Sequence, residues 1–366
     1  MPTLKEIAQR AGVSIPTVSR VLRGQAKETW PVMAKRAAVI RDIAAELNFR
    51  PNAAARAIRS QRTHQVGVLV RNSEESDGLA YTDLAGYEVI LGINQELEKA
   101  DYVLSIVRFD DVAGSQPQLL SRVFREKMLD GIIALGSIPE FVCQKLTGQN
   151  CLWVNSNLWW PQRCIRRDDL HVGRTIAQEL ADLGYQRLVW VDLDLAEASP
   201  HYSTEQRLQG VSEVARARGL ELAALRCPLT STAAERTNLR RLLQPDTAFV
   251  AYNSAVAEKL DRAAISLSRL AGRHYGLASC DDMHHIVINW PELSRVGFDR
   301  FTLGRKAAQM ILKLIDEPSS PCPSELVRDA WIAGQTAPAR GRPRVQAGGA
   351  TGRSPAAEMP TANDPR

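Results

Sequence analysis

The first 24 residues constrain the fold of this chain more than any other stretch. They begin with apolar residues at positions i, i+3, i+4 and i+7, which are Leu4, Ile7, Ala8 and Ala11. Thr3 and Glu6 form a capping-box pair at the start of this pattern. Gly12-Val13-Ser14 then interrupts it, and a second helical pattern runs from Thr17 to Leu22. Two short helices around a tight turn predict a helix-turn-helix, whose second helix enters the major groove of DNA.

The start of the second helix supplies the candidate base-reading side chains. They are Ile15, Pro16, Thr17, Ser19 and Arg20. Arg20 can donate two hydrogen bonds to guanine, a contact that discriminates between bases by roughly 1–3 kcal/mol. Ile15 and Pro16 have no donor, so they can read only shape or a thymine methyl group. The alternatives are that Ile15 is a core residue and that Pro16 is simply a favourable first-turn residue.

The same segment carries groups suited to the DNA backbone. Ser14, Thr17 and Ser19 are candidates for phosphate contacts or for the cap of the second helix, and Thr3 belongs to the same candidate DNA site. Residues 1–62 have a net charge of +8, whereas the rest of the chain has a net charge of −3. This asymmetry predicts a polyanionic partner for the N-terminal segment alone.

Cysteine usage and hydropathy indicate the compartment. The six cysteines form no C-x-x-C pair and lie in apolar runs, as expected of reduced thiols in a cytosol. The N-terminus lacks the apolar core of a signal peptide, and no stretch approaches eighteen apolar residues. We therefore expect a soluble, cytoplasmic protein with no membrane partner.

Two further helical segments follow the first pair. The third pattern places four apolar residues on one face, namely Ile40, Ile43, Ala44 and Leu47. Residues 50–62 are rich in Ala and Arg, and Pro51-Asn52 can begin a helix there. A helix of only a few turns is marginal in isolation, so this segment could fold when it meets DNA.

From Gln65 onward, strand and helix patterns alternate, which is typical of parallel sheets with crossover helices. There are two such series, over residues 66–154 and 172–278, and residues 326–332 are the last predicted strand. Two successive α/β halves predict a ligand cleft lined by loops at the C-terminal ends of strands. Beyond Gly334 the chain is dense in Pro, Gly and Ala without periodicity, and we expect it to be disordered.

Four features, in order, resemble the LacI/GalR family of transcriptional regulators over nearly the whole chain, to about Thr336. They are the head AGVSIPTVSRVLRG, the hinge ELNFRPNAAARAIRSQRT leading into VGVLV, the element RLQG that begins at Arg207, and the pair VAYNS and SCDD. The resemblance implies a homodimer that binds a palindromic double-stranded operator. It also implies a core similar to periplasmic sugar-binding proteins, with a small-molecule effector, expected to be a sugar or sugar derivative, between its subdomains. The family includes effectors that release DNA and effectors that strengthen binding.

The predicted fold is therefore an all-α helix-turn-helix head with a hinge helix, followed by an α/β core. The core is periplasmic-binding-protein-like, with two doubly wound parallel-sheet subdomains. The expected boundaries are 1–49 for the head, 50–63 for the hinge, 64–157 with 296–324 for the N-subdomain, 158–295 with 325–336 for the C-subdomain, and 337–366 for a disordered tail.

By resemblance, the hinge helices of two subunits pair in the minor groove. Ile58 would be the wedge that opens a central base step, at a position where the family usually has Leu. Asn52, Ala55 and Arg56 would face phosphates or the groove floor, and Arg59 would neutralise phosphate. The alternative is that this Ala-rich segment is only a spacer. The loop that follows Gly24 is longer than usual in the family.

Effector contacts are also implied by the resemblance. The residues at the family's effector-contacting positions are Arg207, Asn253 and Asp281. An Arg fork, an amide and a carboxylate together suit a polyhydroxylated ligand. Tyr81 and the pair Trp159-Trp160 could offer an apolar face to a sugar ring, with simple packing as the alternative. We interpret the charge run at residues 166–169 as salt bridging near the crossover between the halves.

No motif points to catalysis. There is no G-x-S-x-G elbow, and no G-x-G-x-x-G follows the first strand. Residues 280–285 have metal-ligand types, but adjacent side chains project in different directions, so we predict no metal site. We expect a protein that is not an enzyme and needs no cofactor. Two rival interpretations are a sugar-binding protein with a vestigial head and an architectural protein that binds DNA without sequence preference.

Overall fold

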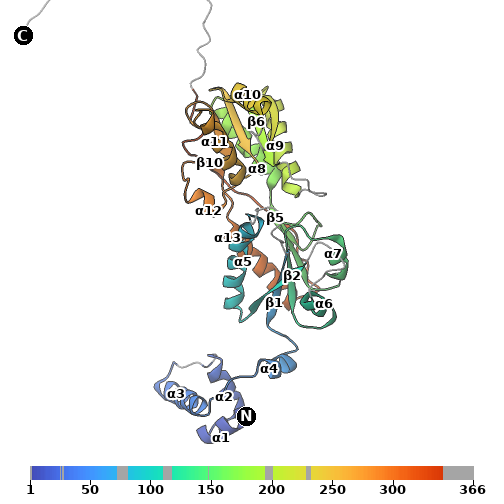
Figure 1. Ribbon diagram of the computed structural model, residues 1–366. Helices are drawn as coiled ribbons and strands as arrows, with labels where there is room; N and C mark the ends of the chain where they lie inside the picture. Colours follow the sequence, from blue (N-terminus) through green and yellow to red (C-terminus); the bar gives the residue numbers. More distant parts are fainter. Residues whose placement is uncertain are drawn as a thin grey trace, which may run out of the picture. The chain divides into compact units, whose positions relative to one another are not determined.

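The computed structural model describes residues 2–24, 26, 29–71, 81–109, 118–146, 148–193, 201–227 and 232–340 (Figure 1). The chain divides into two units. Unit 1 comprises Met1–Arg167 and Asp299–Val327, and unit 2 comprises Asp168–Phe298 and Arg328–Arg366. The chain therefore passes from one unit to the other three times. Among the described residues, no helix has the length and hydropathy needed to cross a membrane.

Three helices form the head of unit 1: α1 (Leu4–Ala11), α2 (Ile15–Leu22) and α3 (Pro31–Glu46). The Thr3 hydroxyl accepts a hydrogen bond from the N–H of Glu6 at 3.3 Å. Gly12 ends α1 with a φ of 63°, a left-handed conformation that glycine adopts without strain. Each helix contributes one fully buried residue to a shared core, namely Ile7, Val18 and Ile40. The predicted helix-turn-helix with a third supporting helix is confirmed.

The hinge segment forms a short helix, α4 (Ala53–Ser60). Asn52 caps it, because its side-chain oxygen accepts hydrogen bonds from the N–H groups of Ala54 and Ala55 at 2.9 and 3.2 Å. Gln61 ends α4 in a left-handed conformation with a φ of 55°. Beyond it, the Asp130 carboxylate accepts from the N–H groups of both Thr63 and His64 at 2.8 Å. The exit from the hinge is thus anchored to unit 1.

The α/β part of unit 1 is built on a six-stranded parallel sheet with the order β11-β5-β4-β3-β1-β2. Its strands are β1 (Gln65–Arg71), β2 (Val103–Phe109), β3 (Gly131–Leu135), β4 (Cys151–Val154), β5 (Cys164–Arg167) and β11 (Glu325–Val327). Its helices are α5 (Tyr81–Lys99), α6 (Gln118–Arg125), α7 (Glu140–Leu146) and α13 (Arg300–Asp316). Helices α5 and α13 pack closely because Gly92 and Gly304 leave room for the facing backbone.

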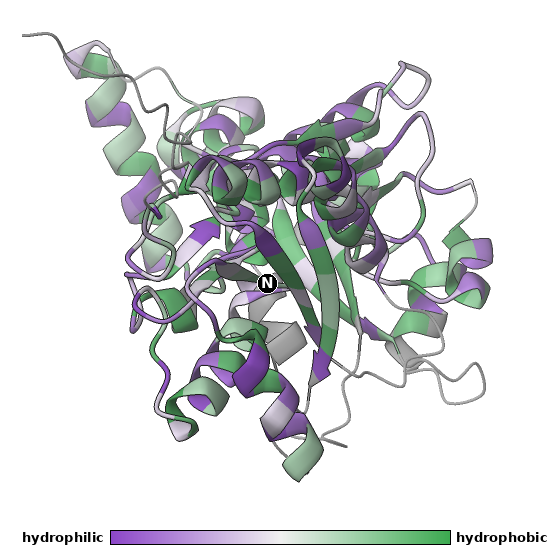
Figure 2. Ribbon diagram, turned by 90° about the horizontal axis from the view of Figure 1, so that it is seen from above, coloured by the Kyte–Doolittle hydropathy of each residue, from purple (hydrophilic) through white to green (hydrophobic). Residues whose placement is uncertain are grey.

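Unit 2 repeats this architecture with a sheet of order β12-β10-β9-β8-β6-β7. Its strands are β6 (Arg187–Leu193), β7 (Glu221–Cys227), β8 (Thr247–Ala251), β9 (Gly276–Ser279), β10 (Ser294–Val296) and β12 (Trp331–Ile332), of which only β12 is antiparallel. Its helices are α8 (Asp169–Asp182), α9 (Tyr202–Arg218), α10 (Ala233–Leu242), α11 (Ser254–Ser266) and α12 (His284–Val287). In Figure 2 the strands are largely green, whereas the helices alternate between green and purple, as expected of buried strands and amphipathic helices.

The structure corrects two expectations about the core, and it also shows where the charge run at residues 166–169 lies. Arg166 and Arg167 end β5 and are buried between β4 and β11, and Asp168 and Asp169 follow them with ion-pair partners, as expected. The single strand expected at residues 326–332 is two strands, β11 and β12, which belong to different sheets. The subdomain boundaries shift accordingly, since β5 and β11 both lie in unit 1 rather than in the C-terminal half.

The expected disordered tail also begins too early. Ala337 is buried in unit 2, and the Pro338 carbonyl accepts from the Tyr185 hydroxyl at 3.0 Å. The Arg340 guanidinium lies over the Tyr185 ring, 5.3 Å from its centroid. Residues 337–340 are ordered because they make these contacts, which local composition does not reveal. The remainder of the predicted tail, residues 341–366, lies outside the described residues.

Candidate functional site

Helix α2 presents one buried face and one exposed face. Val18 and Val21 point into the core of the head. Ile15 is 42% exposed and lies outside that core, which removes its interpretation as a core residue. Pro16 and Arg20 are exposed as well. The first turns of α2 therefore offer an isoleucine, a proline and an arginine to a binding partner.

The hydroxyl groups at the start of α2 were expected to contact phosphates or to cap the helix. Ser14 occupies the N-cap position, but its side chain makes no capping hydrogen bond, so for Ser14 the phosphate contact is the alternative that remains. Its hydroxyl instead lies 2.9 Å from the Thr17 hydroxyl. This pairing fixes two hydroxyl groups next to each other at the N-terminus of α2. Ser19 is half-buried on the same helix.

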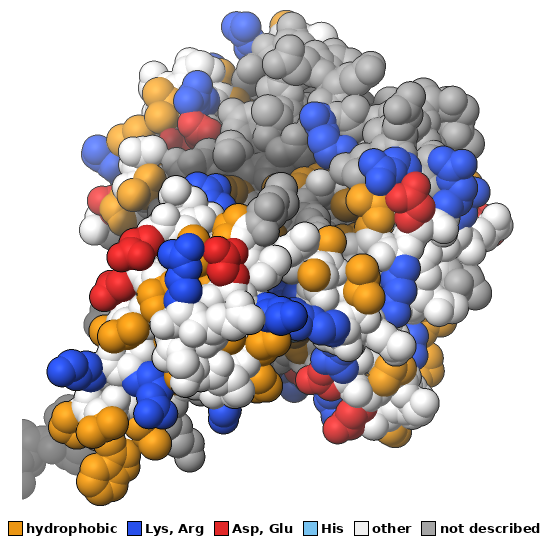
Figure 3. All heavy atoms as spheres, turned by 90° about the horizontal axis from the view of Figure 1, so that it is seen from below, with side chains coloured by type: hydrophobic (Ala, Val, Ile, Leu, Met, Phe, Trp, Pro, Cys, Tyr) orange, Lys and Arg blue, Asp and Glu red, His pale blue; other side chains and the backbone are white. Residues whose placement is uncertain are grey.

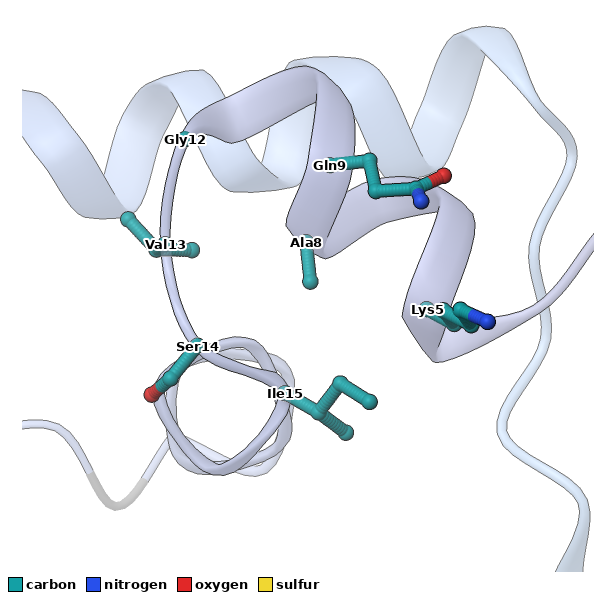
Figure 4. Close-up of a pocket in the computed structure, with 7 residues that line it drawn as sticks. All are labelled: Lys5, Ala8, Gln9, Gly12, Val13, Ser14 and Ile15. Carbon is teal, nitrogen blue, oxygen red and sulfur yellow. The ribbon is translucent and has the colours of Figure 1, made fainter.

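A shallow, open depression of about 490 Å³ lies between α1 and α2 (Figure 4). It is lined by Lys5, Ala8, Gln9, Gly12, Val13, Ser14 and Ile15. Figure 4 shows the side chains of Lys5 and Ile15 extending to the same side, while Ala8 points into the space between the helices. A cation beside an apolar group is an arrangement that suits a phosphate next to a base edge. Lys5 and Gln9 were not among the predicted DNA-binding residues, although both lie on the exposed face of α1.

The hinge helix displays an apolar tip. Ile58 is 79% exposed, the most exposed of the large hydrophobic side chains in the described residues. Arg56 pairs with Asp101 at 3.1 Å, and Arg59 Nε donates to the Ala55 carbonyl at 3.2 Å. Both arginines are thus engaged within the chain, and they must exchange these partners to reach DNA phosphates. On the face drawn in Figure 3, Lys and Arg side chains occupy more of the surface than Asp and Glu.

In unit 2, a buried ion cluster surrounds Arg207 of α9. Arg207 Nε donates to Asp169 of α8 at 2.6 Å, and Nη1 donates to the Tyr252 carbonyl at 2.7 Å. Asp281 Oδ2 lies 3.8 Å from Nη1, and the guanidinium lies 4.8 Å from the centroid of the Tyr252 ring. Helices α8 and α9 come this close because Gly173 has no side chain where it meets the Arg207 backbone.

The electrostatics of this cluster explain how an arginine can be buried. Burial by itself lowers the pKa of Arg207, but the neighbouring Asp169, Tyr252 and Asp281 outweigh it and hold the pKa well above its usual range. The guanidinium therefore stays charged. Asp169 was not predicted as a site residue, because only the long-range contact with Arg207 distinguishes it from the other carboxylates of its helix.

Asn253 and Asp281, the other two predicted effector contacts, also have structural roles. Asn253 caps α11 by accepting from the N–H of Val256 at 2.9 Å. Asp281 Oδ1 accepts from the N–H and the hydroxyl of Ser254 at 3.1 and 3.4 Å. The structure thus brings Asp281 to Arg207 and holds Asn253 at the start of the neighbouring helix.

The predicted aromatic contacts lie in unit 1. The Arg166 guanidinium is 4.5 Å from the centroid of the Trp159 ring, and Trp160 packs edge-on against Trp153 at 5.2 Å. These contacts support a packing role for both tryptophans. The side chain of Tyr81 lies outside the described residues, so its predicted role is untested.

The carboxylates that follow β5 in the charge run form salt bridges, as expected. Asp168 accepts from the N–H of His171 at 3.1 Å, which caps α8, and from Arg328 at 2.8 Å.

Within the described ranges, no three His, Cys, Asp or Glu side chains are grouped as a metal site requires, and the side chains of His284 and His285 lie outside them. Burial raises the pKa of the Cys143 thiol to about 11, which disfavours a reactive thiolate.

Comparison with known proteins agrees with this geometry. Residues 3–52 match the bacterial regulatory proteins of the lacI family, and residues 177–337 match the periplasmic binding protein-like domain. Over 322 residues the chain is 24% identical to YvdE, an uncharacterized HTH-type transcriptional regulator of Bacillus subtilis, covering 87% of this chain and 93% of the relative. Over 325 residues it is 26% identical to the regulator GntR of Pseudomonas aeruginosa, covering 86% and 89%.

Solved structures show the same fold. The lac repressor dimer bound to operator and the anti-inducer ONPF has a TM-score of 0.70 at 20% identity and covers 92% of this chain and 99% of its own. The complex of the regulator CelR with cellobiose has a TM-score of 0.61 at 19% identity and covers 92% and 100%. A helix-turn-helix head joined to a two-sheet α/β core defines a class of two-part transcriptional regulators. This chain has both parts of that class, a DNA-binding domain of the lacI family and a periplasmic binding protein-like domain, and its relatives over most of its length are transcriptional regulators.

Proposed function

We propose that this regulator binds a palindromic operator as a homodimer and that a small-molecule effector, a sugar or sugar derivative, changes its affinity for that operator. The observation that carries the proposal is the exposed face of α2, where Ile15, Pro16 and Arg20 stand on a fully buried three-helix core. A rigid support of this kind holds base-reading side chains in register. The net charge of +8 on residues 1–62 adds the phosphate attraction that such binding needs.

The dimer follows from the operator's symmetry. One head reads one half-site, and two heads related by a two-fold axis read a palindrome. A single α4 presents a single Ile58, so a wedge at a central base step requires a second copy beside it. The lac repressor structure, which has the same fold, is a dimer on its operator.

Replacing Arg20 with alanine tests the reading of DNA. Because Arg20 is the exposed reader on α2 that can donate two hydrogen bonds to guanine, its loss should lower affinity for a selected palindrome by roughly 5- to 150-fold for each half-site. Preference at one base pair per half-site should relax. Fluorescence anisotropy with the selected palindrome, single-base variants and random DNA measures both effects.

The matched control is Arg23→Ala at the C-terminal end of the same helix. Arg23 is exposed at the end of α2, where we expect it to contact only the DNA backbone. Its loss should therefore lower the affinity for all DNA sequences alike and reduce the salt dependence of binding. If wild-type protein binds the palindrome no better than random DNA, the architectural role is favoured instead. An absence of DNA binding at any salt concentration would favour a sugar-binding protein with a vestigial head.

The effector proposal rests on the cluster around Arg207 in unit 2. Arg207 is a charged donor, Asp281 is an acceptor, and the Tyr252 ring is an apolar surface beside them. This combination suits vicinal hydroxyl groups on a sugar ring. CelR was solved with cellobiose, and a LacI family regulator from Enterococcus faecium was solved with ribose. Coupling between effector and operator in such systems amounts to roughly 1–3 kcal/mol.

Asp281→Asn tests this site. The substitution keeps an oxygen for Ser254 but removes the charge that faces Arg207, so sugar affinity should fall by roughly 10- to 100-fold while operator affinity is unchanged. The measurement is the rise in melting temperature with a panel of mono- and disaccharides that includes cellobiose and ribose. Asp282→Asn is the control. Asp282 is the neighbouring carboxylate, but it accepts a hydrogen bond from the N–H of Phe298 and is not the carboxylate that faces Arg207. An Asp281→Asn protein that responds like wild type would place the effector elsewhere.

A further inference from the structure

Three side chains beside the Arg207 cluster form a continuous hydrogen-bonded chain that the family resemblance did not indicate. His201 Nδ1 lies 2.8 Å from the Ser203 hydroxyl, and that hydroxyl lies 2.8 Å from the Tyr252 hydroxyl. His201 is the N-cap of α9, Ser203 is in its first turn and is buried, and Tyr252 follows β8. Two elements of unit 2 are thereby linked through hydroxyl groups alone.

The direction of these hydrogen bonds follows from the backbone. The N–H of Ser203 points at His201 Nδ1 from 3.4 Å, so Nδ1 is an acceptor and carries no proton in the neutral ring. The Ser203 hydroxyl must then donate to Nδ1, and its oxygen must accept from the Tyr252 hydroxyl. Burial raises the pKa of Tyr252, although Arg207 opposes this, so the hydroxyl keeps its proton. In this state the Tyr252 hydroxyl donates to Ser203, and its lone pairs face the neighbouring Thr204 side chain and a ligand.

Protonation of His201 reverses the chain without breaking it. A proton taken up from solvent at Nδ1 makes the ring a donor to the Ser203 oxygen. The Ser203 hydroxyl then rotates to donate to the Tyr252 oxygen, and the Tyr252 O–H turns away from Ser203. Both hydrogen bonds of the chain are retained with opposite polarity, whereas the N–H of Ser203 loses Nδ1 as its acceptor.

We propose that His201 is a positioning residue that sets, through Ser203, whether Tyr252 presents an acceptor or a donor to the effector. The proposal rests on the effector site proposed above, because Tyr252 is the residue over which Arg207 lies. When His201 is neutral, Tyr252 calls for a ligand donor at this position, such as an amine or a hydroxyl, and a hydroxyl can serve in either state because it both donates and accepts. Protonation favours a ligand with an acceptor, such as a carboxylate or carbonyl oxygen, at the same position.

Charged and titratable neighbours of this relay come from two helices and two strand ends. They are Tyr202 and Arg207 of α9, Asp169 of α8, Tyr252 after β8 and Asp281 after β9. Arg207 is held by Asp169 and faces Asp281, so its charge is compensated within the cluster. Arg207 stays charged at any ordinary pH, and among the three side chains of the relay only an imidazole is of a type that ordinarily changes charge near neutrality.

The test uses the full-length, effector-free protein with 13C-labelled tyrosine and histidine. We expect the Cζ signal of Tyr252, assigned with Tyr252→Phe, to move as pH falls from about 8 to about 5.5, with the same midpoint as the His201 ring signal. Ser203→Ala removes the linking hydroxyl, and in that variant the Tyr252 signal should become independent of His201. His201→Asn keeps an acceptor and a good N-cap but cannot titrate, so the signal should stay at its high-pH position.

Two results would overturn the relay. One is a Tyr252 signal that does not follow His201 in the wild-type protein, and the other is a signal that still follows it in Ser203→Ala. Melting curves of each variant without ligand establish that it is folded. Since none of these measurements needs an effector, the relay and the sugar proposal can fail separately.

Discussion

Replacing Ile58 with alanine should lower affinity for the palindromic operator by roughly 30- to 100-fold while leaving affinity for random DNA within about threefold. Ile58 is 79% exposed, so it contributes little to the stability of the head or of unit 1. Insertion between base pairs would bury this exposed isoleucine side chain and bend the duplex. Alanine keeps α4 helical but removes the wedge. Anisotropy with both DNAs at fixed salt measures the two affinities.

Ile58→Leu is the matched control for this experiment. Leucine preserves apolar volume and helix propensity, and affinity for the operator should stay within a few-fold of wild type. Arg59→Ala supplies a second comparison, because the loss of a phosphate contact should lower the affinities for operator and for random DNA alike. Equal losses on both DNAs for Ile58→Ala would remove the wedge and leave α4 as a basic spacer.

Replacing Asp169 with asparagine should lower the free energy of unfolding of unit 2 by roughly 3–5 kcal/mol, the usual cost of breaking a buried ion pair, because Asp281 at 3.8 Å is too far from Arg207 to replace the contact at 2.6 Å. Asp169 and Arg207 are both almost fully buried and lie 2.6 Å apart. Asparagine has nearly the same shape, so the loss reports the charge rather than a cavity. Urea unfolding followed by circular dichroism, with and without added salt, measures the change.

Asp182→Asn on the same helix is the control. Asp182 pairs with Arg218 at 3.1 Å, but both side chains are about half exposed, so the cost should be at most about 1 kcal/mol and should shrink in salt. If the two variants lose similar amounts of free energy of unfolding, the Arg207 cluster is hydrated and contributes no more to stability than a surface ion pair does. That outcome would also weaken the proposal that Arg207 is held in place for an effector.

Local sequence rules were sufficient for the head and for most of the core. The spacing of Ile7 and Ala8 before Gly12, and of Val18 and Val21 after it, placed both helices of the helix-turn-helix correctly. Caps, turns and helical periodicity involve residues within four positions of each other, so they can be identified without tertiary contacts. The alternation of apolar strands with amphipathic helices identified the α/β class for the same reason.

Local rules failed where a charged residue is buried by a distant partner. Residues 164–167 form a central strand although half of them are arginines, because β4 and β11 enclose them. The buried cluster around Arg207 depends on Asp169 and Arg207, which are separated by 38 positions and meet only because Gly173 lets α8 approach α9.

The amino-acid sequence by itself therefore determined the helix-turn-helix, the hinge helix and the two α/β halves, since each depends on short-range periodicity. Only the tertiary structure decided that residues 326–332 divide between two sheets and that residues 337–340 pack on unit 2. It also decided which carboxylates hold Arg207 and that a hydroxyl relay links His201 to Tyr252. The physical reason is that burial of polar and charged groups is favourable only with specific partners, and those partners are brought together by packing rather than by sequence distance.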